Sequence, residues 1–305
     1  MKVALLQGGR SLERGVSLRS GARVAEALSD IGHEVEVLDL GPDLVAKLEG
    51  IRPDVAFIAL HGTEGEDGTV QALLDLLDIP HTGPGVAACQ RCMDKSLAKH
   101  ILRENGLPTP NWVTYSEAAI RDFGAASSFQ RAVDTVGLPL VAKPASQGSS
   151  LGVKVVTRAE DIPGALMTAL SYDNRAILET WVSGRELAVS VLGDQVLPIV
   201  EAIPTDNNAY DFEARYEIGG ASFVCPAELS DEDADEVNRV ALAAYNALGC
   251  SGFSRVDLIL GDDGPQILEI NAIPGLTETS LLPQAAEAAG VEFEAMVARI
   301  IDLAL

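Results

Sequence analysis

The chain has 305 residues, of which 47% are hydrophobic, 22% charged and 5% aromatic, the composition of an ordinary globular protein. A single hydrophobic core stops growing near ~250–300 residues, so we expect two or three packed lobes. The 22 basic and 45 acidic side chains leave a formal net charge of −23, which argues against nucleic acid and anionic membranes as partners.

The N-terminal segment MKVALLQGG contains one lysine and a short apolar stretch, which is too little for a signal peptide. No apolar run in the sequence reaches the ~18–20 residues that cross a bilayer. We therefore expect a cytoplasmic protein.

Residues 1–93 alternate short apolar strands with helices. The predicted strands are Val3–Leu6, Val35–Leu40, Val55–Leu60 and a brief Ile79–His81, and the predicted helices are Ser17–Ile31, Leu44–Leu48 and Thr69–Leu77. This alternation predicts a parallel sheet that is covered on both faces. Ligands of such sheets bind beyond the carboxyl ends of the strands, so the turns at Gly8-Gly9 and His61-Gly62 are candidate sites.

Four cysteines are present, and Cys89 and Cys92 form a CxxC pair. A CxxC can indicate zinc or redox chemistry, but no second pair follows, and the surrounding segment is typical of a helix with both sulfurs on its apolar side. We therefore interpret both residues as small buried thiols. A disulfide framework is not expected in the cytosol.

Residues 94–180 follow the pattern of a smaller α+β lobe, which the predicted helix Lys95–Asn105 enters through two prolines. Its other predicted elements are strands at Trp112–Tyr115, Leu138–Lys143, Gly152–Val156 and Ala176–Thr180, and helices at Phe129–Val136 and Ala159–Tyr172.

Residues 181–305 predict a third lobe. Its predicted strands are Arg185–Gly193, Gln195–Ile203, Gly252–Leu260 and Gln266–Asn271, and its predicted helices are Asp231–Leu248 and Phe293–Ala304. The polar stretch 204–220 has no clear periodicity, and loops of this length in compact domains are often functional lids.

Three oxygen-bearing side chains lie on adjacent predicted strands, Asp257 on one and Glu269 and Asn271 on the next. The turn Gly261–Gly264 makes these strands antiparallel neighbours, and residues two apart project from the same face. Isolated charge would be costly among the surrounding isoleucines and leucines. A Mg²⁺ site that bridges phosphates is therefore favoured over a solvated sheet face.

Lys143 ends a predicted strand, and a loop containing Gly148, Ser149 and Ser150 follows it. Successive N–H groups and hydroxyls in such a loop suit an anion, although the spacing is not that of a Walker loop and the GxGxxG fingerprint is missing from the chain. On these residues alone, a phosphate site and a plain turn remain equally open.

The segment Leu178–Glu186 joins the second lobe to the third. Ligands often bind at such junctions, where backbone groups of the segment can meet an adenine edge. A simple hinge is an equally good interpretation of this segment.

Taken together, these features resemble the ATP-grasp superfamily and, in detail, the D-alanine–D-alanine ligase family. The motifs are QGGRSLERGVSL and ALHGTEGEDGTVQ in the first lobe, MDK and KPASQGSSLGV in the second, and YDFEARY, RVDL and LEINAIPGLTETSLLP in the third. The resemblance covers essentially the whole chain. It implies a homodimer with a three-lobed α/β (α+β) ATP-grasp fold and an N-terminal Rossmann-like parallel sheet, with lobes 1–93, 94–180 and 181–305.

The resemblance implies that ATP phosphorylates the carboxylate of one D-alanine and that the amine of a second D-alanine attacks the acyl phosphate, supplying peptidoglycan synthesis. The implied ATP-binding residues are Lys95, Lys143, Ser149, Ser150 and Arg215 at the phosphates, Glu179, Trp181 and Val182 at the adenine, and Glu186 at the ribose. Two Mg²⁺ ions, with Mn²⁺ as an alternative, would be held by Asp257, Glu269 and Asn271.

For the substrates, the resemblance implies a second set of residues. These are Glu13 at the ammonium of the first D-alanine, His61 near its carboxylate, Arg255 and the Gly275 N–H at the oxyanion, and Ser280 with the Leu281 N–H at the carboxylate of the second D-alanine. Tyr216 would close over the site toward Ser150 and Glu13, excluding the water that hydrolyses acyl phosphates.

The chain departs from the family pattern at Gly15, Arg215 and Thr279, none of which is an expected metal ligand or oxyanion donor. Three alternatives stay open on the sequence. One is an ATP-grasp ligase with other substrates, such as a dipeptide or D-alanine–D-lactate ligase, although Tyr216 favours an amine as second substrate. The others are a non-catalytic nucleotide-binding module and a nicotinamide-dependent oxidoreductase with Asp39 as its ribose acid.

Overall fold

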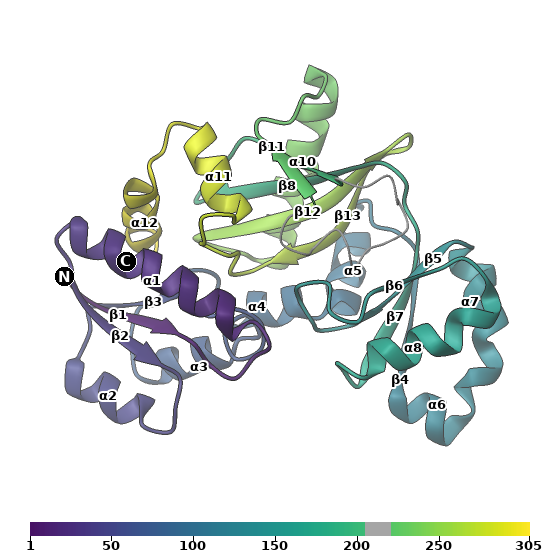
Figure 1. Cartoon of the computed structure of the whole chain (residues 1–305), viewed down its shortest axis with the longest axis horizontal. Helices are drawn as coiled ribbons and strands as arrows, with labels where there is room; N and C mark the ends of the chain where they lie inside the picture. The colour runs from purple at the N-terminus through teal and green to yellow at the C-terminus, as the bar shows by residue number, and fades with distance from the viewer. Residues whose placement is uncertain (205–220) are drawn as a thin grey trace.

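The computed structural model describes residues 1–204 and 221–305, whose strands form three separate sheets (Figure 1). The predicted lid residues Arg215 and Tyr216 lie outside the described residues. No helix in the described part of the chain is both long and apolar enough to cross a membrane.

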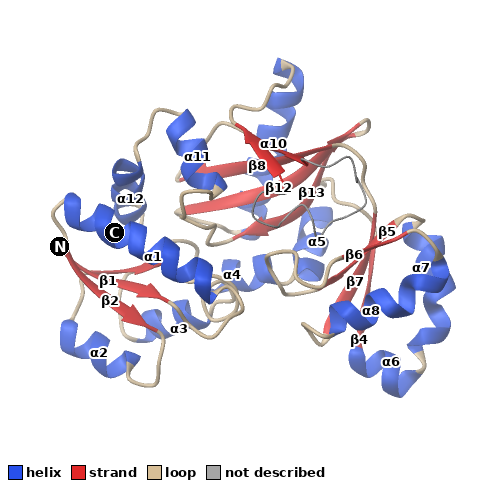
Figure 2. Ribbon diagram, in the orientation of Figure 1, coloured by secondary structure: helices blue, strands red, loops and turns tan. Residues whose placement is uncertain are grey.

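The first sheet is parallel with the order β2-β1-β3, as expected from the alternation of strands and helices. Its elements are β1 (Lys2–Gln7), α1 (Arg14–Asp30), β2 (Glu34–Asp39), α2 (Leu44–Ile51), β3 (Val55–Ile58) and α3 (Thr69–Leu76). Residues 3–6 of β1 are fully buried because α1 covers one face of the sheet and α2 and α3 lie on the other (Figure 2). The predicted fourth strand is wrong, because His81 makes only an isolated bridge to Ala56.

Two consecutive helices, α4 (Val86–Met93) and α5 (Lys95–Glu104), run from the first sheet beneath the third toward the second (Figure 1). The break between them falls at Asp94, which is extended and whose side chain accepts a hydrogen bond from the Leu97 N–H as the N-cap of α5. This cap fixes the point at which α5 begins and therefore the direction in which Lys95 projects.

The second sheet is antiparallel with the order β4-β7-β5-β6. Its strands are β4 (Trp112–Ser116), β5 (Leu140–Pro144), β6 (Lys154–Val156) and β7 (Arg175–Thr180), and its helices are α6 (Glu117–Phe123), α7 (Phe129–Val136) and α8 (Ile162–Leu170). Sequence reasoning missed α6, which Ser116 caps by accepting from the Ala119 N–H. The predicted helix over residues 159–172 starts later, because Pro163 occupies the first turn of α8.

The third sheet has the order β11-β10-β8-β12-β13, with β9 paired to β8, and all its pairings are antiparallel. Its elements are β8 (Arg185–Leu192), β9 (Gln195–Val196), β10 (Val200–Pro204), β11 (Ala221–Val224), α10 (Asp231–Leu248), β12 (Phe253–Gly261), β13 (Gly264–Asn271), α11 (Leu281–Ala288) and α12 (Phe293–Asp302). The predicted strand 195–203 is interrupted around Pro198, which has no N–H to donate to a ladder. Sequence reasoning also missed α11.

The three lobes pack as two bodies, because the first and third lobes share one hydrophobic core. One continuous cluster joins the first and third sheets through α4 and α5, and includes Phe57, Cys89 and Phe253. A separate cluster lies under the second sheet and includes Leu140 and Ile162. The second sheet with its helices is therefore the unit packed independently, and the main cleft lies between it and the larger body.

Candidate active site

The floor of the main cleft is the hairpin of β12 and β13. Asp257 pairs with Glu269 and Arg255 pairs with Asn271 across the two strands, so all four side chains share one face. The Arg255 guanidinium donates through Nε and Nη2 to the two Asp257 carboxylate oxygens, both at 2.7 Å, and Asn271 Nδ2 donates to Asp257 Oδ2 at 2.9 Å. The structure thus brings the three predicted metal ligands together with the predicted oxyanion donor.

Glu269 is held by a lysine from a different element. Lys95, the first residue of α5, lies with its Nζ 3.0 Å from Glu269 Oε2 and donates to the Gln147 carbonyl at 2.6 Å. Burial raises the pKa of Glu269, but the charges of Lys95 and Lys143 outweigh burial and leave that pKa below its usual value. The carboxylate is therefore ionised and able to bind a cation.

The donor set fits a hard cation that is shared with phosphate. Among the residues that the structure describes, no group of three His, Cys, Asp or Glu side chains converges as a self-sufficient metal cluster. Asp257 and Glu269 supply two carboxylates, and Asn271 adds an amide oxygen from the same face of the hairpin. An incomplete set of oxygen ligands of this kind suits Mg²⁺, which usually completes its shell with phosphate oxygens and water.

A second part of the cleft lies between β5, β7 and the hairpin, where nucleotide binding was predicted. It is lined by Lys95, Lys143, Ser150, Glu179, Trp181 and Val182 together with Asp257 and Glu269. Ser149 and Ser150 adopt left-handed backbone conformations, with φ of 49° and 54°. Strained conformations of this kind in non-glycine residues cluster at ligand sites, which supports the phosphate-loop interpretation over a plain turn.

Glu179 occupies this part of the cleft in a way that the sequence did not predict. Its carboxylate accepts a hydrogen bond from Lys143 Nζ at 2.9 Å and lies 2.5 Å from Lys99 Nζ, while the adenine contact expected from the resemblance stays a prediction. Burial raises the pKa of Glu179, whereas Lys143 and Lys99 lower it and prevail. Lys99 was missed by sequence reasoning; the only signal was its position four residues after Lys95 on the same helix.

Glu13 lies at the other end of the cleft, immediately before α1. Ser149 Oγ donates to Glu13 Oε1 at 2.5 Å, so the loop between β5 and β6 of the second sheet touches the first lobe. A Cβ added at Gly62 would lie 2.6 Å from Glu13 Oε2, and one added at Gly148 would lie 3.0 Å from the same atom. The carboxylate is thus seated between two backbones that only glycine allows to approach so closely.

His61 is buried, with 3% of its surface exposed, and is fixed on both ring nitrogens. Nε2 lies 2.9 Å from Ser20 Oγ, and Nδ1 lies 3.2 Å from the Ile273 carbonyl and 3.5 Å from Glu66. Burial raises the pKa of Glu66. Ser20 also accepts from the Leu276 N–H at 3.1 Å, so this missed serine ties α1 to the loop that follows β13.

That loop carries the last predicted group. Ser280 is the residue before α11, its Oγ accepts from the Thr277 N–H at 3.0 Å, and a Cβ at Gly275 would lie 2.7 Å from the same oxygen. Leu281 begins α11, and the N–H groups of a first helical turn have no partner within the helix. Glu13, His61, Arg255, Gly275, Ser280 and Leu281 all line one pocket with the acidic hairpin.

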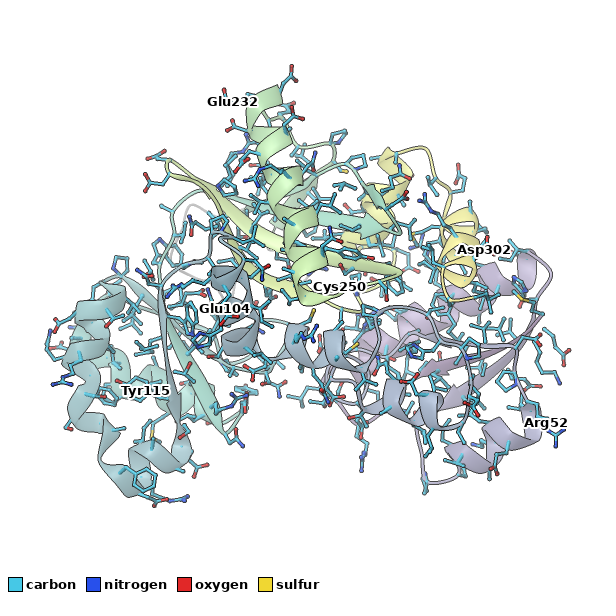
Figure 3. All side chains as sticks on the ribbon, turned by 180° about the vertical axis from the view of Figure 1, so that it is seen from behind. Arg52, Glu104, Tyr115, Glu232, Cys250 and Asp302 are labelled. Carbon is cyan, nitrogen blue, oxygen red and sulfur yellow. The ribbon has the colours of Figure 1, made fainter. Side chains whose placement is uncertain are left out.

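Two other candidates are accounted for structurally. Asp39 binds both terminal nitrogens of Arg14 and the Gly9 N–H, so its carboxylate is committed to the protein rather than placed for a ribose. Cys89 and Cys92 are buried on α4, and Cys92 Sγ lies 3.5 Å from Cys250 Sγ just beyond the end of α10 (Figure 3). Both thiols are buried, as the interpretation of Cys89 and Cys92 as small buried thiols predicts.

Comparison with known proteins gives consistent matches along the whole chain. The family model described as D-ala D-ala ligase C-terminus matches residues 101–302, and the model described as D-ala D-ala ligase N-terminus matches residues 43–84. The D-alanine–D-alanine ligase of Pelotomaculum thermopropionicum is 40% identical over 309 residues, covering 100% of this chain and 97% of the relative. That of Moorella thermoacetica is 41% identical over 309 residues, covering 100% and 99%.

Solved structures agree with these matches. The D-alanine–D-alanine ligase from Bacillus anthracis complexed with ATP is similar with a TM-score of 0.85 and 33% identity, covering 100% of this chain and 97% of that one. The VanG D-Ala:D-Ser ligase from Enterococcus faecalis is similar with a TM-score of 0.84 and 27% identity, covering 100% and 99%. The three-lobed α/β fold expected from the sequence is confirmed.

Proposed function

This chain belongs to the D-alanine–D-alanine ligase family, and we infer that it joins two D-alanine molecules into D-alanyl-D-alanine for peptidoglycan synthesis, converting ATP to ADP and phosphate. The observation that carries this inference is the arrangement of Arg255 beside Asp257 and Glu269 on the floor of the cleft. The same pocket contains Glu13, His61 and the start of α11.

In the first step, we propose, a carboxylate oxygen of one D-alanine attacks the terminal phosphorus of ATP, and the bond to the bridging oxygen breaks to release ADP. Lys95, Lys143 and the loop at Ser149 and Ser150 would hold the phosphates, and Arg215 would join them. Glu179, Trp181 and Val182 would contact the adenine, and Glu186 would bind the ribose. This assignment of ATP-binding residues is supported by their position: all of them except Ser149, Glu186 and Arg215 line the part of the cleft between β5, β7 and the hairpin.

Two Mg²⁺ ions would be bound by Asp257, Glu269 and Asn271, and Mn²⁺ could replace Mg²⁺. A bound divalent ion neutralises phosphate charge during transfer. The chain itself contributes the orientation of the two carboxylates, which Arg255 and Lys95 fix by hydrogen bonds and charge.

In the second step the amine of the second D-alanine attacks the acyl carbon, and inorganic phosphate leaves. Glu13 would bind the ammonium group of the first D-alanine, and His61 would lie near its carboxylate. Arg255 and the Gly275 N–H would stabilise the oxyanion, and Ser280 with the Leu281 N–H would bind the second carboxylate. Tyr216 would close over the site toward Ser150 and Glu13.

We further propose that the active form is a homodimer and that the reaction takes place in the cytoplasm, where ATP is supplied. Size-exclusion chromatography with light scattering measures the molar mass of the protein and so tests the oligomeric state directly. A mass of about one chain, 32.1 kDa, would overturn the dimer while leaving the activity unaffected.

The activity is tested by ATP-dependent phosphate release with Mg²⁺, identifying products by mass. The arms contain D-alanine, L-alanine, D-alanine with D-lactate, D-alanine with D-serine, or no amino acid. Release with D-alanine alone, giving D-alanyl-D-alanine, is the expected result. Release that needs D-lactate, D-serine or an L-amino acid would reassign the substrate, and ATP binding without turnover in any arm would favour a non-catalytic module.

A further inference from the structure

Lys99 is a lysine with no exposed surface in the described part of the molecule. It lies on α5 one turn beyond Lys95 and is 0% exposed. Its Nζ lies 2.5 Å from Glu179 Oε2, donates to Thr109 Oγ1 at 2.7 Å and donates to the Pro110 carbonyl at 3.2 Å. The ammonium group thus donates two hydrogen bonds, and its third contact is the ion pair with Glu179. A fully buried lysine is rare unless its charge has a structural or functional use.

The charge of Lys99 belongs to a cluster that faces the nucleotide cleft. Glu179 lies between Lys99 on one oxygen and Lys143 on the other, so two ammonium groups share one carboxylate. The cluster therefore carries one net positive charge. Lys99 cannot contact a ligand with its charge because its side chain is fully buried. The Lys143 side chain, in contrast, is 10% exposed and lines the cleft.

This arrangement determines how much of the Lys143 charge is available to a phosphate. If Lys99 were absent, Lys143 would be the sole counter-ion of a buried carboxylate, and the cluster would have no net charge to offer. With Lys99 present, the negative charge of Glu179 is neutralised from the side that faces the protein interior. Glu179 still orients Lys143 through a 2.9 Å hydrogen bond, while the excess charge faces the ligand.

Lys99 also touches the link between the two bodies of the molecule. Thr109, which accepts from Lys99, donates in turn to the Ile267 carbonyl of β13 at 2.8 Å, and the Ile267 N–H donates to the Pro108 carbonyl at 3.0 Å. One ammonium group thus contacts β7 of the second sheet and the segment anchored to the metal-site hairpin. These two surfaces enclose the nucleotide part of the cleft.

We propose that Lys99 is a positioning residue for ATP: it neutralises Glu179 from the protein interior, so that Lys143 is both oriented and left with its charge for the phosphates. The proposal rests on the proposed function, because the anion concerned is the triphosphate of ATP. Lys99 itself touches no substrate.

The test compares Lys99→Met with the double variant Lys99→Met/Glu179→Gln. The single variant removes the net charge of the cluster, and the double variant restores it with both buried charges gone. We expect the Kd for ATP, measured by calorimetry without D-alanine, to rise about tenfold in the single variant and to recover most of that loss in the double variant. The KM for D-alanine should stay within about twofold in both. Lys47→Met removes an exposed lysine of α2 and serves as the matched control.

Rescue by the second substitution separates electrostatics from packing, because a packing defect at residue 99 would not be repaired by changing Glu179. If Lys99→Met does not fold by circular dichroism, Lys99→Gln keeps a donor for Glu179 and Thr109 and removes only the charge. If the Kd for ATP is unchanged in the single variant, or is higher in the double variant than in the single, the inference about Lys99 is wrong while the proposed function stands. A wild-type protein that does not bind ATP would overturn the proposed function as well.

Discussion

Asp257 and Glu269 lie directly opposite one another on β12 and β13, and each carboxylate has a basic partner from its own surroundings. Arg255 makes two 2.7 Å hydrogen bonds to Asp257, and Lys95 lies 3.0 Å from Glu269. The charges of Lys95 and Lys143 hold the pKa of Glu269 below its usual value, so this carboxylate is ionised, the form that a metal–phosphate complex requires. The hairpin is therefore charge-balanced as folded, and its acidic pair is easy to test separately from the fold.

Glu269→Gln keeps the shape of the side chain and removes its charge. We expect the Mg²⁺ concentration for half-maximal activity to rise by roughly 10–100-fold, because a ligand of the ion loses its negative charge. The measurement is phosphate release against Mg²⁺ concentration at saturating ATP and D-alanine. Asp263→Asn, at an exposed acid in the turn of the same hairpin, is the control and should leave the curve unchanged. An unaltered Mg²⁺ dependence in Glu269→Gln would remove Glu269 from the metal site.

Arg255→Lys tests the oxyanion role with the charge retained. Lysine cannot reproduce the planar fork that binds both oxygens of Asp257, so its charge will not be held toward the reacting carbon. We expect kcat to fall by about 10²–10³-fold, about 3–4 kcal/mol of transition-state stabilisation, with the Kd for ATP little changed. Arg239→Lys, at an exposed arginine paired with Glu236 on α10, should have wild-type kinetics. A kcat within a fewfold of wild type in Arg255→Lys would show that Arg255 serves Asp257 alone.

Gly62→Ala tests whether Glu13 must sit where the structure places it. The new Cβ would lie 2.6 Å from Glu13 Oε2, and Gly62 has a φ of 73°, where alanine is strained by roughly 1–2 kcal/mol. We expect the KM for D-alanine to rise while the Kd for ATP stays near wild type. Gly32→Ala introduces the same kind of strain at a φ of 86° with no atom within 4 Å. Equal effects of the two substitutions on the KM for D-alanine would contradict the assignment of Glu13.

The sequence predicted which side chains of the acidic hairpin share a face better than it predicted the boundaries of the elements. Asp257, Glu269 and Asn271 could be placed on one face, because strand periodicity and a short turn determine both register and direction. Lys99 and Ser20 could not be identified, because both act through tertiary contacts with residues distant in sequence, Glu179 and His61. The helices α6 and α11 were missed although α2 and α7, which are similarly short, were predicted. In α11, Pro283 lies in the first turn, and a proline inside a helical pattern is taken as the end of a helix.

The cysteines provide a test of the interpretation that they are structural. Cys89, Cys92 and Cys250 are buried, so a thiol reagent cannot reach them without local opening of the structure. Burial raises the pKa of Cys89, and the hydrogen bond to Cys250 together with burial raises that of Cys92, whereas the same hydrogen bond lowers the pKa of Cys250. Cys225 is only half-buried. We expect a thiol reagent to modify Cys225 first in the native protein and the other three only on unfolding. The folded Cys225→Ser variant should then react hardly at all with the thiol reagent. Rapid modification of a second thiol in the native protein, or zinc bound to the purified protein, would contradict this interpretation.

The pH dependence of ATP binding follows from the burial of Lys99. Burial lowers the pKa of Lys99 to about 8, opposed by the charge of Glu179 and assisted by those of Lys143 and Arg103. Below that value the cluster carries its net positive charge, and above it Lys99 becomes neutral and Lys143 is left as the counter-ion of Glu179. We therefore expect the affinity for ATP to be level near pH 7 and to fall as the pH rises through 8, toward the affinity of Lys99→Met.

The free energy of unfolding should respond in the opposite direction, which distinguishes this titration from general alkaline damage. The ordinary pKa of lysine, 10.5, lies above the folded value, so between about pH 8 and 10.5 the unfolded chain holds a proton that the folded chain has lost. The contribution of Lys99 to stability is therefore smallest below pH 8 and increases as the pH rises. Urea unfolding of the wild type and of Lys99→Met at pH 7 and 9.5 measures it as the change in their stability difference. The prediction is contradicted if, between pH 7 and 9.5, both the affinity for ATP and the free energy of unfolding of the wild type decrease. If Lys99→Met/Glu179→Gln shows the same two decreases, a group other than Lys99 titrates.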